Sequence, residues 1–200
     1  QSKHLPPKGA DALSLRTRFI DDWLVLSGKE NGGEESDERT LCKNPIVVNL
    51  GAGLDSRPYR LSEFKDSKTR LYLEVDMDKS LLDKKHRVLK SRVGNPLCPV
   101  RSVEADLSNA DQTRDALVAA GLCTHHEHTR SGDPNMSMPS VDWIMEGLLA
   151  YIDPKFHDAL FKLCYDMSGR NSRICFNVLE PVGRKNFDSN SIAKNSDIHR

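Results

Sequence analysis

The chain has 200 residues, and its 29 lysines and arginines balance its 29 aspartates and glutamates, so its net charge is zero. Nucleic-acid and anionic-membrane partners favour a clear basic excess, so this balance argues against both. The length suits one domain with a sizeable core, and we expect residues 1–200 to form a single domain. There is no apolar run of membrane-spanning length, and the first residues, QSKHLPPKGA, contain no hydrophobic signal region. Five scattered cysteines without a C-x-x-C pair indicate a reducing, cytoplasmic setting.

Helical and strand patterns alternate along the chain. Apolar residues recur at approximately helical spacing over residues 12–27, and Gly28 is expected to end this first helix. Strands are then predicted at 46–50, 71–75, 99–104, 141–145 and 173–179, and helices at 79–91, 111–120 and 154–167. Residues 28–44 and 122–140 are polar and are predicted to be loops, and residues 182–200 receive no element. This alternation predicts βαβ units and an α/β fold with a Rossmann-like, doubly wound, mostly parallel sheet.

The run from Ile46 to Leu50 leads directly into Gly51-Ala52-Gly53. A strand followed by such a turn lets the backbone approach a ligand closely, because no Cβ stands in the way. A dinucleotide fingerprint would have a third glycine where this chain has Ser56, which weakens an assignment to NAD. Asp55 adds a carboxylate that is unfavourable near a pyrophosphate but acceptable near a cationic ligand such as a sulfonium. Alone, however, the turn is a weak signal.

Acidic residues stand at the ends of the next two predicted strands. Glu74 and Asp76 are two residues apart, so their side chains point to the same side of the strand. A carboxylate at this edge can accept both hydroxyls of a ribose, and Asp76 is the first choice because it lies nearer the strand end. Asp78 is expected to cap the following helix instead. Asp106 could accept from an adenine amine while the backbone N–H of Leu107 addresses the ring, or it could be a local cap.

Four segments carry a resemblance to a known family. They are R-T-R-F-I-D-D at 16–22, V-N-L-G-A-G-L-D-S-R at 48–57, E-V-D at 74–76 and W-I-M-E-G-L-L-A-Y at 143–151. With these motifs the sequence resembles the leucine carboxyl methyltransferase family, which includes a large branch of S-adenosylmethionine-dependent methyltransferases without an assigned substrate. The likeness runs from Leu13 to Pro181.

The resemblance implies a class I methyltransferase type of sheet and S-adenosylmethionine as the cofactor. Arg16, with Arg18 as second choice, would hold the methionyl carboxylate, since a guanidinium grips a carboxylate with two prongs. Glu146 would lie near the cofactor's amino group or sulfonium. The full set of expected cofactor-binding residues is Arg16, Arg18, Gly51, Ala52, Gly53, Asp55, Glu74, Asp76, Asp106, Leu107 and Glu146.

The C-terminal end departs from the family pattern. After Leu179 the chain has no counterpart of the closing strands of a methyltransferase sheet, so we expect either a chain truncated at its C-terminus or a rebuilt end. Two alternatives therefore stand beside the methyltransferase: a non-catalytic or truncated relative, and an NAD-dependent oxidoreductase. The segment containing His125, His126 and His128 matches no standard zinc spacing, so a solvated loop and no metal are expected.

Nothing in the sequence assigns a catalytic residue. No Ser/His/Asp or Cys/His arrangement stands out, which agrees with an acceptor that needs no general base. We expect O-methylation of a carboxylate or hydroxyl, on a small molecule or on a protein C-terminus. The resemblance to the branch without an assigned substrate favours a small molecule, and the oligomeric state stays open. Tyr151 is expected to pack rather than to line the acceptor side.

Overall fold

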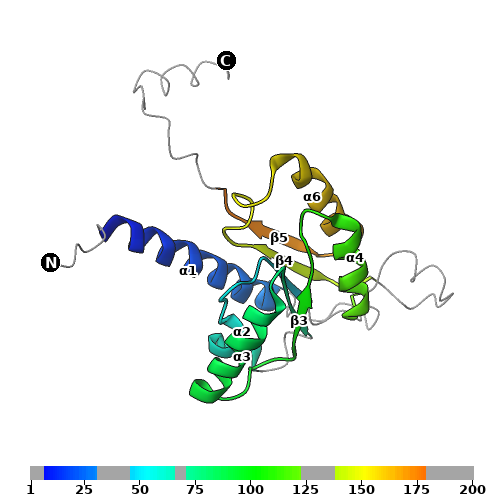
Figure 1. Ribbon diagram of the computed structural model, residues 1–200. Helices are drawn as coiled ribbons and strands as arrows, with labels where there is room; N and C mark the ends of the chain where they lie inside the picture. Colours follow the sequence, from blue (N-terminus) through cyan, green and yellow to red (C-terminus); the bar gives the residue numbers. More distant parts are fainter. Residues whose placement is uncertain (1–6, 31–45, 66–70, 123–137, 179–200) are drawn as a thin grey trace, which may run out of the picture.

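The computed structural model describes residues 7–30, 46–65, 71–122 and 138–178, and Figure 1 shows their arrangement. Five strands form one sheet in the order β3-β2-β1-β4-β5, and every neighbouring pair is parallel. The strands are β1 (Ile46–Leu50), β2 (Leu71–Asp76), β3 (Val100–Glu104), β4 (Val141–Met145) and β5 (Arg173–Phe176). The predicted α/β fold with a doubly wound parallel sheet is confirmed.

The order of the strands creates a crevice beside β1. The chain leaves β1 for β2 and β3 on one side and returns to β4 and β5 on the other. β1 therefore pairs with both β2 and β4, and the connections diverge at its carboxyl end. In open parallel sheets, this reversal of strand order is where ligands bind.

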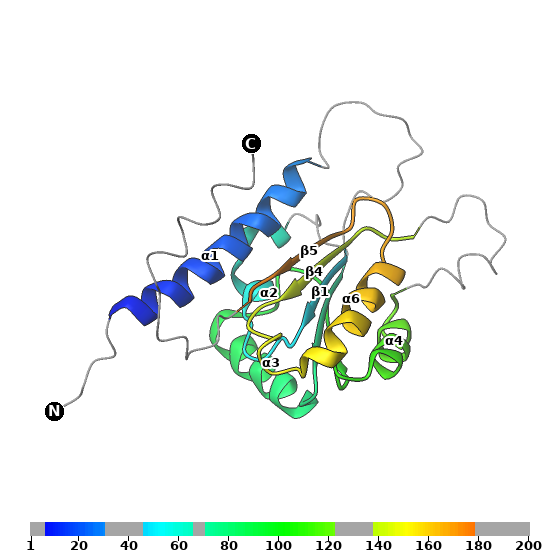
Figure 2. The ribbon, with the colours of Figure 1, turned by 90° about the horizontal axis from the view of Figure 1, so that it is seen from above.

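Helices cover both faces of the sheet (Figure 2). One face carries α1 (Pro7–Glu30), α2 (Arg57–Arg60), the short η1 (Ser62–Phe64) and α3 (Lys79–Val93). The other carries α4 (Ala110–Ala119) and α6 (His157–Asp166), which follows the turn η2 (Pro154–Phe156). Two helical layers explain why the strands are apolar on both sides.

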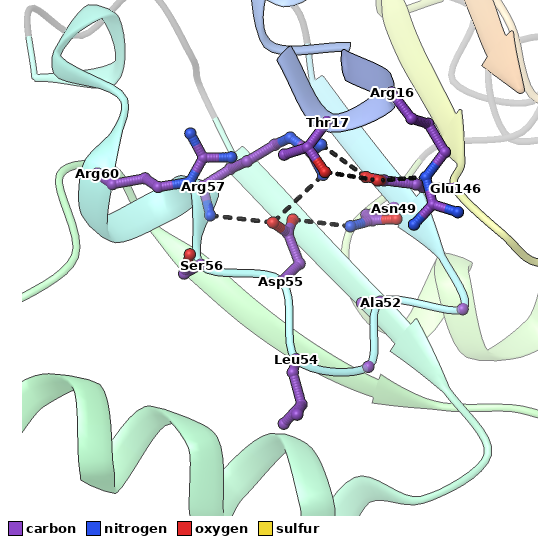
Figure 3. Close-up of a pocket in the computed structure, with 12 residues that line it drawn as sticks. Arg16, Thr17, Asn49, Ala52, Leu54, Asp55, Ser56, Arg57, Arg60 and Glu146 are labelled. Carbon is purple, nitrogen blue, oxygen red and sulfur yellow. Dashed lines mark hydrogen bonds and ion pairs between the residues drawn. The ribbon is translucent and has the colours of Figure 1, made fainter. Parts of the chain in front are cut away.

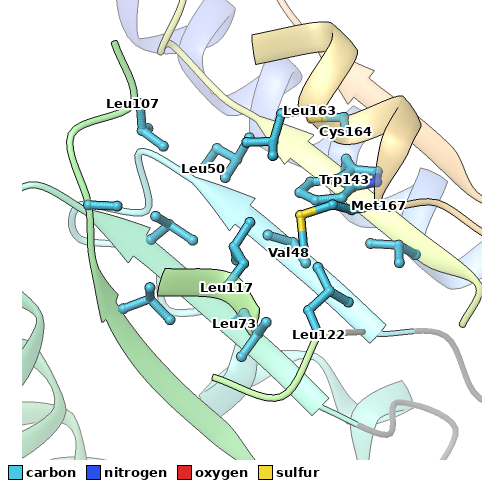
Figure 4. Close-up of a cluster of buried hydrophobic side chains, with 14 of the residues drawn as sticks. Val48, Leu50, Leu73, Leu107, Leu117, Leu122, Trp143, Leu163, Cys164 and Met167 are labelled. Carbon is cyan, nitrogen blue, oxygen red and sulfur yellow. The ribbon is translucent and has the colours of Figure 1, made fainter. Parts of the chain in front are cut away.

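Alternate residues of β1, β2 and β4 enter two separate cores on opposite faces of the sheet. Val48 and Leu50 point toward α4 and α6, where Leu117, Leu163 and Trp143 complete the larger cluster (Figure 4). Leu117 and Leu163 have no exposed surface. On the opposite face, Ile20 and Leu24 of α1 pack with Val47, Tyr72 and Ile144. The spacing of Ile20 and Leu24, one helical turn, gives α1 its buried side.

Several predicted boundaries were wrong. The first helix begins at Pro7 and continues past Gly28 to Glu30, because an interior glycine costs about 1 kcal/mol, too little to end a helix by itself. The last strand ends at Phe176, and Asn177 turns its side chain to accept from the backbone N–H of Gly147 at 2.6 Å. The two short helices α2 and η1 had no predicted counterpart. Most of the predicted loops at 28–44 and 122–140, the segment 182–200 and His125, His126 and His128 lie outside the described residues.

Candidate functional site

The turn after β1 is fixed by backbone hydrogen bonds. The N–H groups of Gly51 and Ala52 donate to the carbonyl of Val75 at 2.8 and 3.0 Å, and that of Gly53 donates to the Asp76 carboxylate at 2.9 Å. Gly51 has a φ of +71°, and a Cβ there would lie 2.7 Å from Cδ1 of Leu148. Glycine is required at this position for both reasons. The turn thus connects β1, the end of β2 and the loop after β4.

Two cavities adjoin this turn and share Gly51 and Glu146. The first, of about 380 Å³, has a mainly polar and charged lining (Figure 3): Arg16, Thr17, Asn49, Gly51, Ala52, Gly53, Leu54, Asp55, Ser56, Arg57, Arg60 and Glu146. The second, of about 480 Å³, has a more apolar lining: Gly51, Asp76, Met77, Ala105, Asp106, Leu107, Ser108, Glu146, Gly147, Leu148, Tyr151, Ile152 and Asp153. Both volumes lie in the range typical of small-molecule sites. They meet at the carboxyl ends of β1 and β4, where the strand order reverses.

Glu146, directly after β4, is bound from two sides. Its Oε1 accepts from Nε of Arg16 at 2.8 Å and from the hydroxyl of Thr17 at 3.0 Å, while its Oε2 accepts from Arg57 at 2.6 Å. Burial raises the pKa of this carboxyl, but the Arg57 guanidinium outweighs burial, and the pKa lies below its ordinary value. Glu146 is therefore ionised at neutral pH and joins α1 to the sheet.

Arg57 lies at the centre of a buried ion network. Besides its bond to Glu146, it donates from Nε to Asp21 of α1 at 2.7 Å and from Nη1 to Asp55 at 3.3 Å. Only 1% of the residue is exposed to solvent. Burial lowers the pKa of the guanidinium, but Asp55 and the other acidic neighbours raise it above its ordinary value. Arg60 binds the same Asp21 through both terminal nitrogens, at 2.6 and 2.9 Å.

Both oxygens of the Asp55 carboxylate accept hydrogen bonds from groups within the protein. Oδ2 accepts from the hydroxyl of Tyr72 at 2.6 Å and from the amide of Asn49 at 2.8 Å, and Oδ1 accepts from the backbone N–H of Arg57 at 3.0 Å. Burial, and then Asp55, raises the pKa of Tyr72 well above its ordinary value, so the phenol stays protonated and donates. Asp55 thus lines the first cavity but also fixes the shape of the turn.

Three of the predicted residues line the second cavity but not the first. Asp76 and Asp106 line it from the ends of β2 and β3, and Leu107 follows Asp106. Asp106 also accepts from the backbone and hydroxyl of Ser108 at 2.9 and 2.7 Å, so the local turn and the cavity position coexist. The expected cap is confirmed: Asp78 accepts from the backbone N–H of Leu81 at 3.0 Å.

Two predicted residues lie away from the described lining of both cavities. Arg18 is on the outer side of α1, 75% exposed, and pairs with Asp22 one turn later. Glu74 has no exposed surface and lies under α3, where it binds Lys85 at 2.8 Å and His86 at 2.7 Å. Burial raises the pKa of Glu74 despite the opposing effect of the neighbouring Lys85. Tyr151, expected to pack, is 87% exposed at the second cavity, so that expectation was wrong.

Among the residues of the site that were not singled out from the sequence are Thr17, Asp21, Asn49 and Arg57. All four fall inside the two motifs R-T-R-F-I-D-D and V-N-L-G-A-G-L-D-S-R. Their polar character next to buried positions was the available signal, but it did not show which partner each would meet. The contact between residues 57 and 146 spans 89 positions of the chain.

Two features are absent from the residues that the structure describes. No helix in this part of the chain is long and apolar enough to cross a membrane. Within the same ranges, no group of three or more His, Cys, Asp or Glu side chains has the arrangement of a metal site.

The sequence of the chain is similar to the sequences of curated proteins. A protein of Mycolicibacterium smegmatis, named as an inferred S-adenosyl-L-methionine-dependent methyltransferase, is 32% identical over 178 residues, which are 89% of this chain and 48% of that protein. A protein of Mycobacterium marinum with a corresponding name is 33% identical over 171 residues, 86% of this chain and 46% of that protein. The chain spans about half the length of the curated relatives it matches.

Solved structures show weaker similarity. LepI in complex with SAM has a TM-score of 0.41 and 12% identity, over 74% of this chain and 30% of that one. The methyltransferase domain of a bacterial CtHen1 has a TM-score of 0.40 and 15% identity, over 67% and 57%. At these scores neither superposition bears on function. The model of the family described as Leucine carboxyl methyltransferase, by contrast, matches residues 1–164. With most of its length matched by that model, the chain belongs to the leucine carboxyl methyltransferase family.

Proposed function

We propose that this chain forms the S-adenosylmethionine site of a methyltransferase. The observation that carries the proposal is the meeting of two cavities of contrasting character at Gly51 and Glu146. An adenosine group with an amino-acid arm needs an apolar compartment with polar edges on one side and charged groups on the other. The relatives are named for this cofactor, which supports the same assignment.

The amino-acid arm of the cofactor would lie in the first cavity, the charged cavity, whose lining is mainly polar and charged. The described bond of Arg16 to Glu146 uses Nε alone, and its two terminal nitrogens extend toward the side of the glycine turn (Figure 3). Such a pair of N–H donors suits a carboxylate. Glu146, ionised and adjacent, would face the positively charged amino group. Gly147 lies beside Arg16 with a φ of +70°, which favours glycine, and a Cβ there would make an ordinary 3.5 Å contact with the guanidinium.

The adenosine would lie in the second cavity. Asp76 would accept from the ribose hydroxyls, and its carboxylate is already oriented by the N–H of Gly53. Asp106 and the backbone of Leu107 would address the adenine edge, between apolar side chains such as Leu148 and Ile152. Arg18 and Glu74 are not part of this proposal, and Asp55 has a shaping role.

The bound cofactor would supply a methyl group on a positively charged sulfur, open to direct displacement by a nucleophile. The protein's part is to align the acceptor and exclude water. Among the described residues that line the two cavities, none is a histidine, lysine or cysteine. Glu146 is held by three donors and has a lowered pKa, which makes it a poor base. We therefore favour a carboxylate acceptor, which is already ionised at neutral pH, over a hydroxyl.

The remaining assignments are also proposals. The acceptor is a small molecule or a protein C-terminus, as the motifs suggest. A reducing, cytoplasmic setting is supported by Cys98, Cys164 and Cys175, which are buried and free. We also propose that residues 1–200 belong to one domain.

The test is calorimetric titration of the chain with S-adenosylmethionine and S-adenosylhomocysteine, with NAD as comparator. We expect micromolar binding of the two sulfur ligands and none of NAD. Arg16→Gln should weaken binding on the order of tenfold or more, which is typical of losing hydrogen bonds to a charged group. The matched control is Arg18→Gln, which removes a guanidinium from the same helix but from its exposed side.

A second pair of variants tests the ribose assignment. Asp76→Asn is expected to weaken both sulfur ligands, whereas Asp78→Asn keeps a capping side chain and should not. Failure of the folded wild-type chain to bind either sulfur ligand would reject the proposal and leave the non-catalytic relative. Tighter binding of NAD would instead favour an oxidoreductase. Binding followed by transfer of a labelled methyl group to carboxylic acids, but not to phenols, would establish the acceptor class.

A further inference from the structure

Among the described side chains, only Arg57 contacts three carboxylates from three different parts of the fold. The first is on α1, the second is in the glycine-turn segment and the third follows β4. Each of its three nitrogens approaches a different carboxylate: Asp21, Asp55 and Glu146. The guanidinium is buried against these groups, and Arg57 is part of the lining of the charged cavity (Figure 3). The network described here contains three arginines and three carboxylates, so its charges balance.

Arg57 determines how Glu146 and α1 are presented to the cavity. It binds one oxygen of Glu146, while Arg16 and Thr17 bind the other, so the carboxylate is restrained from opposite sides. It also binds Asp21, which lies one helical turn after Thr17 on α1. The same guanidinium therefore fixes both the acid and the helix that carries Arg16.

We propose that Arg57 is the positioning residue for the amino-acid arm of the cofactor, acting through Glu146 and Arg16 without contacting the adenosine. The proposal rests on the proposed function, because it assumes that the charged cavity binds that arm. Lysine would be a poor replacement. Its ammonium is a compact charge, whereas the planar guanidinium serves three carboxylates in three directions.

The two halves of the ligand can be tested separately. S-adenosylhomocysteine contains the amino-acid arm, whereas 5′-methylthioadenosine retains the adenosine and sulfur but lacks the α-amino and α-carboxylate groups. We expect Arg57→Lys to raise the Kd for S-adenosylhomocysteine on the order of tenfold. The Kd for 5′-methylthioadenosine should not change, because Asp76 and the apolar side chains of the second cavity make no described contact with Arg57.

Arg173→Lys is the matched control. Arg173 also joins α1 to the sheet, since it donates to the carbonyl of Trp23 and binds Asp142, but it lies outside the described lining of both cavities. It should leave both dissociation constants unchanged. Asp21→Asn is a second variant that keeps Arg57 but weakens its hold on α1, and it should reproduce the selective loss if Arg57→Lys does not fold.

The outcomes separate the two proposals. A selective loss of S-adenosylhomocysteine binding in Arg57→Lys or Asp21→Asn, absent in Arg173→Lys, supports the positioning role. Equal weakening of both ligands, or no weakening of either, overturns that role while the proposed function stands. If the folded wild-type chain binds neither ligand, both proposals are overturned.

Discussion

Replacing Gly51 with alanine combines two costs that the structure separates. The positive φ of +71° costs an L-residue about 1–2 kcal/mol. The new Cβ would also lie 2.7 Å from Cδ1 of Leu148, whereas Cγ and Cβ of that side chain stay at 3.4 and 3.5 Å. Only the tip of Leu148 must move, so an off-rotamer adjustment adds about 0.5–1.5 kcal/mol. We expect Gly51→Ala to lower the free energy of unfolding by about 2–3 kcal/mol.

Gly53→Ala is the matched variant in the same turn. Its φ of +47° brings similar strain, but a Cβ there meets only the carbonyl oxygen of Gly51 at an ordinary 3.9 Å. Urea denaturation should give a loss of about 1–2 kcal/mol for this variant. The gain from restricting the unfolded chain is the same in both variants and cancels in the comparison. The reasoning would be refuted if Gly51→Ala lowered the free energy of unfolding no more than Gly53→Ala does. It would also be refuted if Gly51→Ala cost as much in a Leu148→Ala background as it does in the wild type.

Three further predictions concern stability. Burial raises the pKa values of Asp21 and Glu146, but Arg60 and Arg57 outweigh it, so both lie below the ordinary 3.8 and 4.5. Their stabilising contribution is therefore complete at neutral pH and is lost as the pH falls below about 4.5 through the folded-state values. In urea titrations at decreasing pH, Glu146→Gln should show a shallower decline than the wild type, and parallel curves would contradict this. Leu117→Ala, at a fully buried position, should cost about 2–5 kcal/mol by the same measurement, and a cost below 1 kcal/mol would mean that the core cluster is loosely packed. Asp78→Ala removes the N-cap of α3 and should cost about 1 kcal/mol, which an unchanged midpoint would disprove.

The sheet was predictable because most of its strands are short apolar runs, and β1 is in addition β-branched and bounded by Pro45 and Gly51. Ile46 to Leu50 is buried on both faces, and such runs are recognisable without knowledge of neighbours. Helix ends were harder. Gly28 looked like a stop, yet its local cost is small compared with continuing the hydrogen bonds of α1. The short α2 follows a turn and has no apolar period of its own, so nothing in the pattern marked it.

The site was predictable only in part. The sequence indicates to which side of a strand or helix a side chain points, but not which other element packs over that side. Asp76 and Glu74 share one side of β2, but α3 lies over Glu74 and leaves Asp76 at the cavity. Arg16 and Arg18 are similarly close in sequence, yet two residues correspond to roughly 200° of helix rotation, so one faces Glu146 and the other solvent. The role of Asp55 depended on Tyr72, which no local pattern connects to it.

The contact between Arg16 and Glu146 joins residues 130 positions apart. At ribosomal rates of about 5–20 residues per second, α1 is made on the order of ten seconds before its acidic partner exists. During that time Ile20 and Leu24 can meet Val47 and Tyr72 but lack the rest of their core, since Ile144 is also synthesised late. We therefore expect α1 to be the last element to dock during folding. The charged cavity is then closed by a helix that was made well before the strand that supplies its acidic partner.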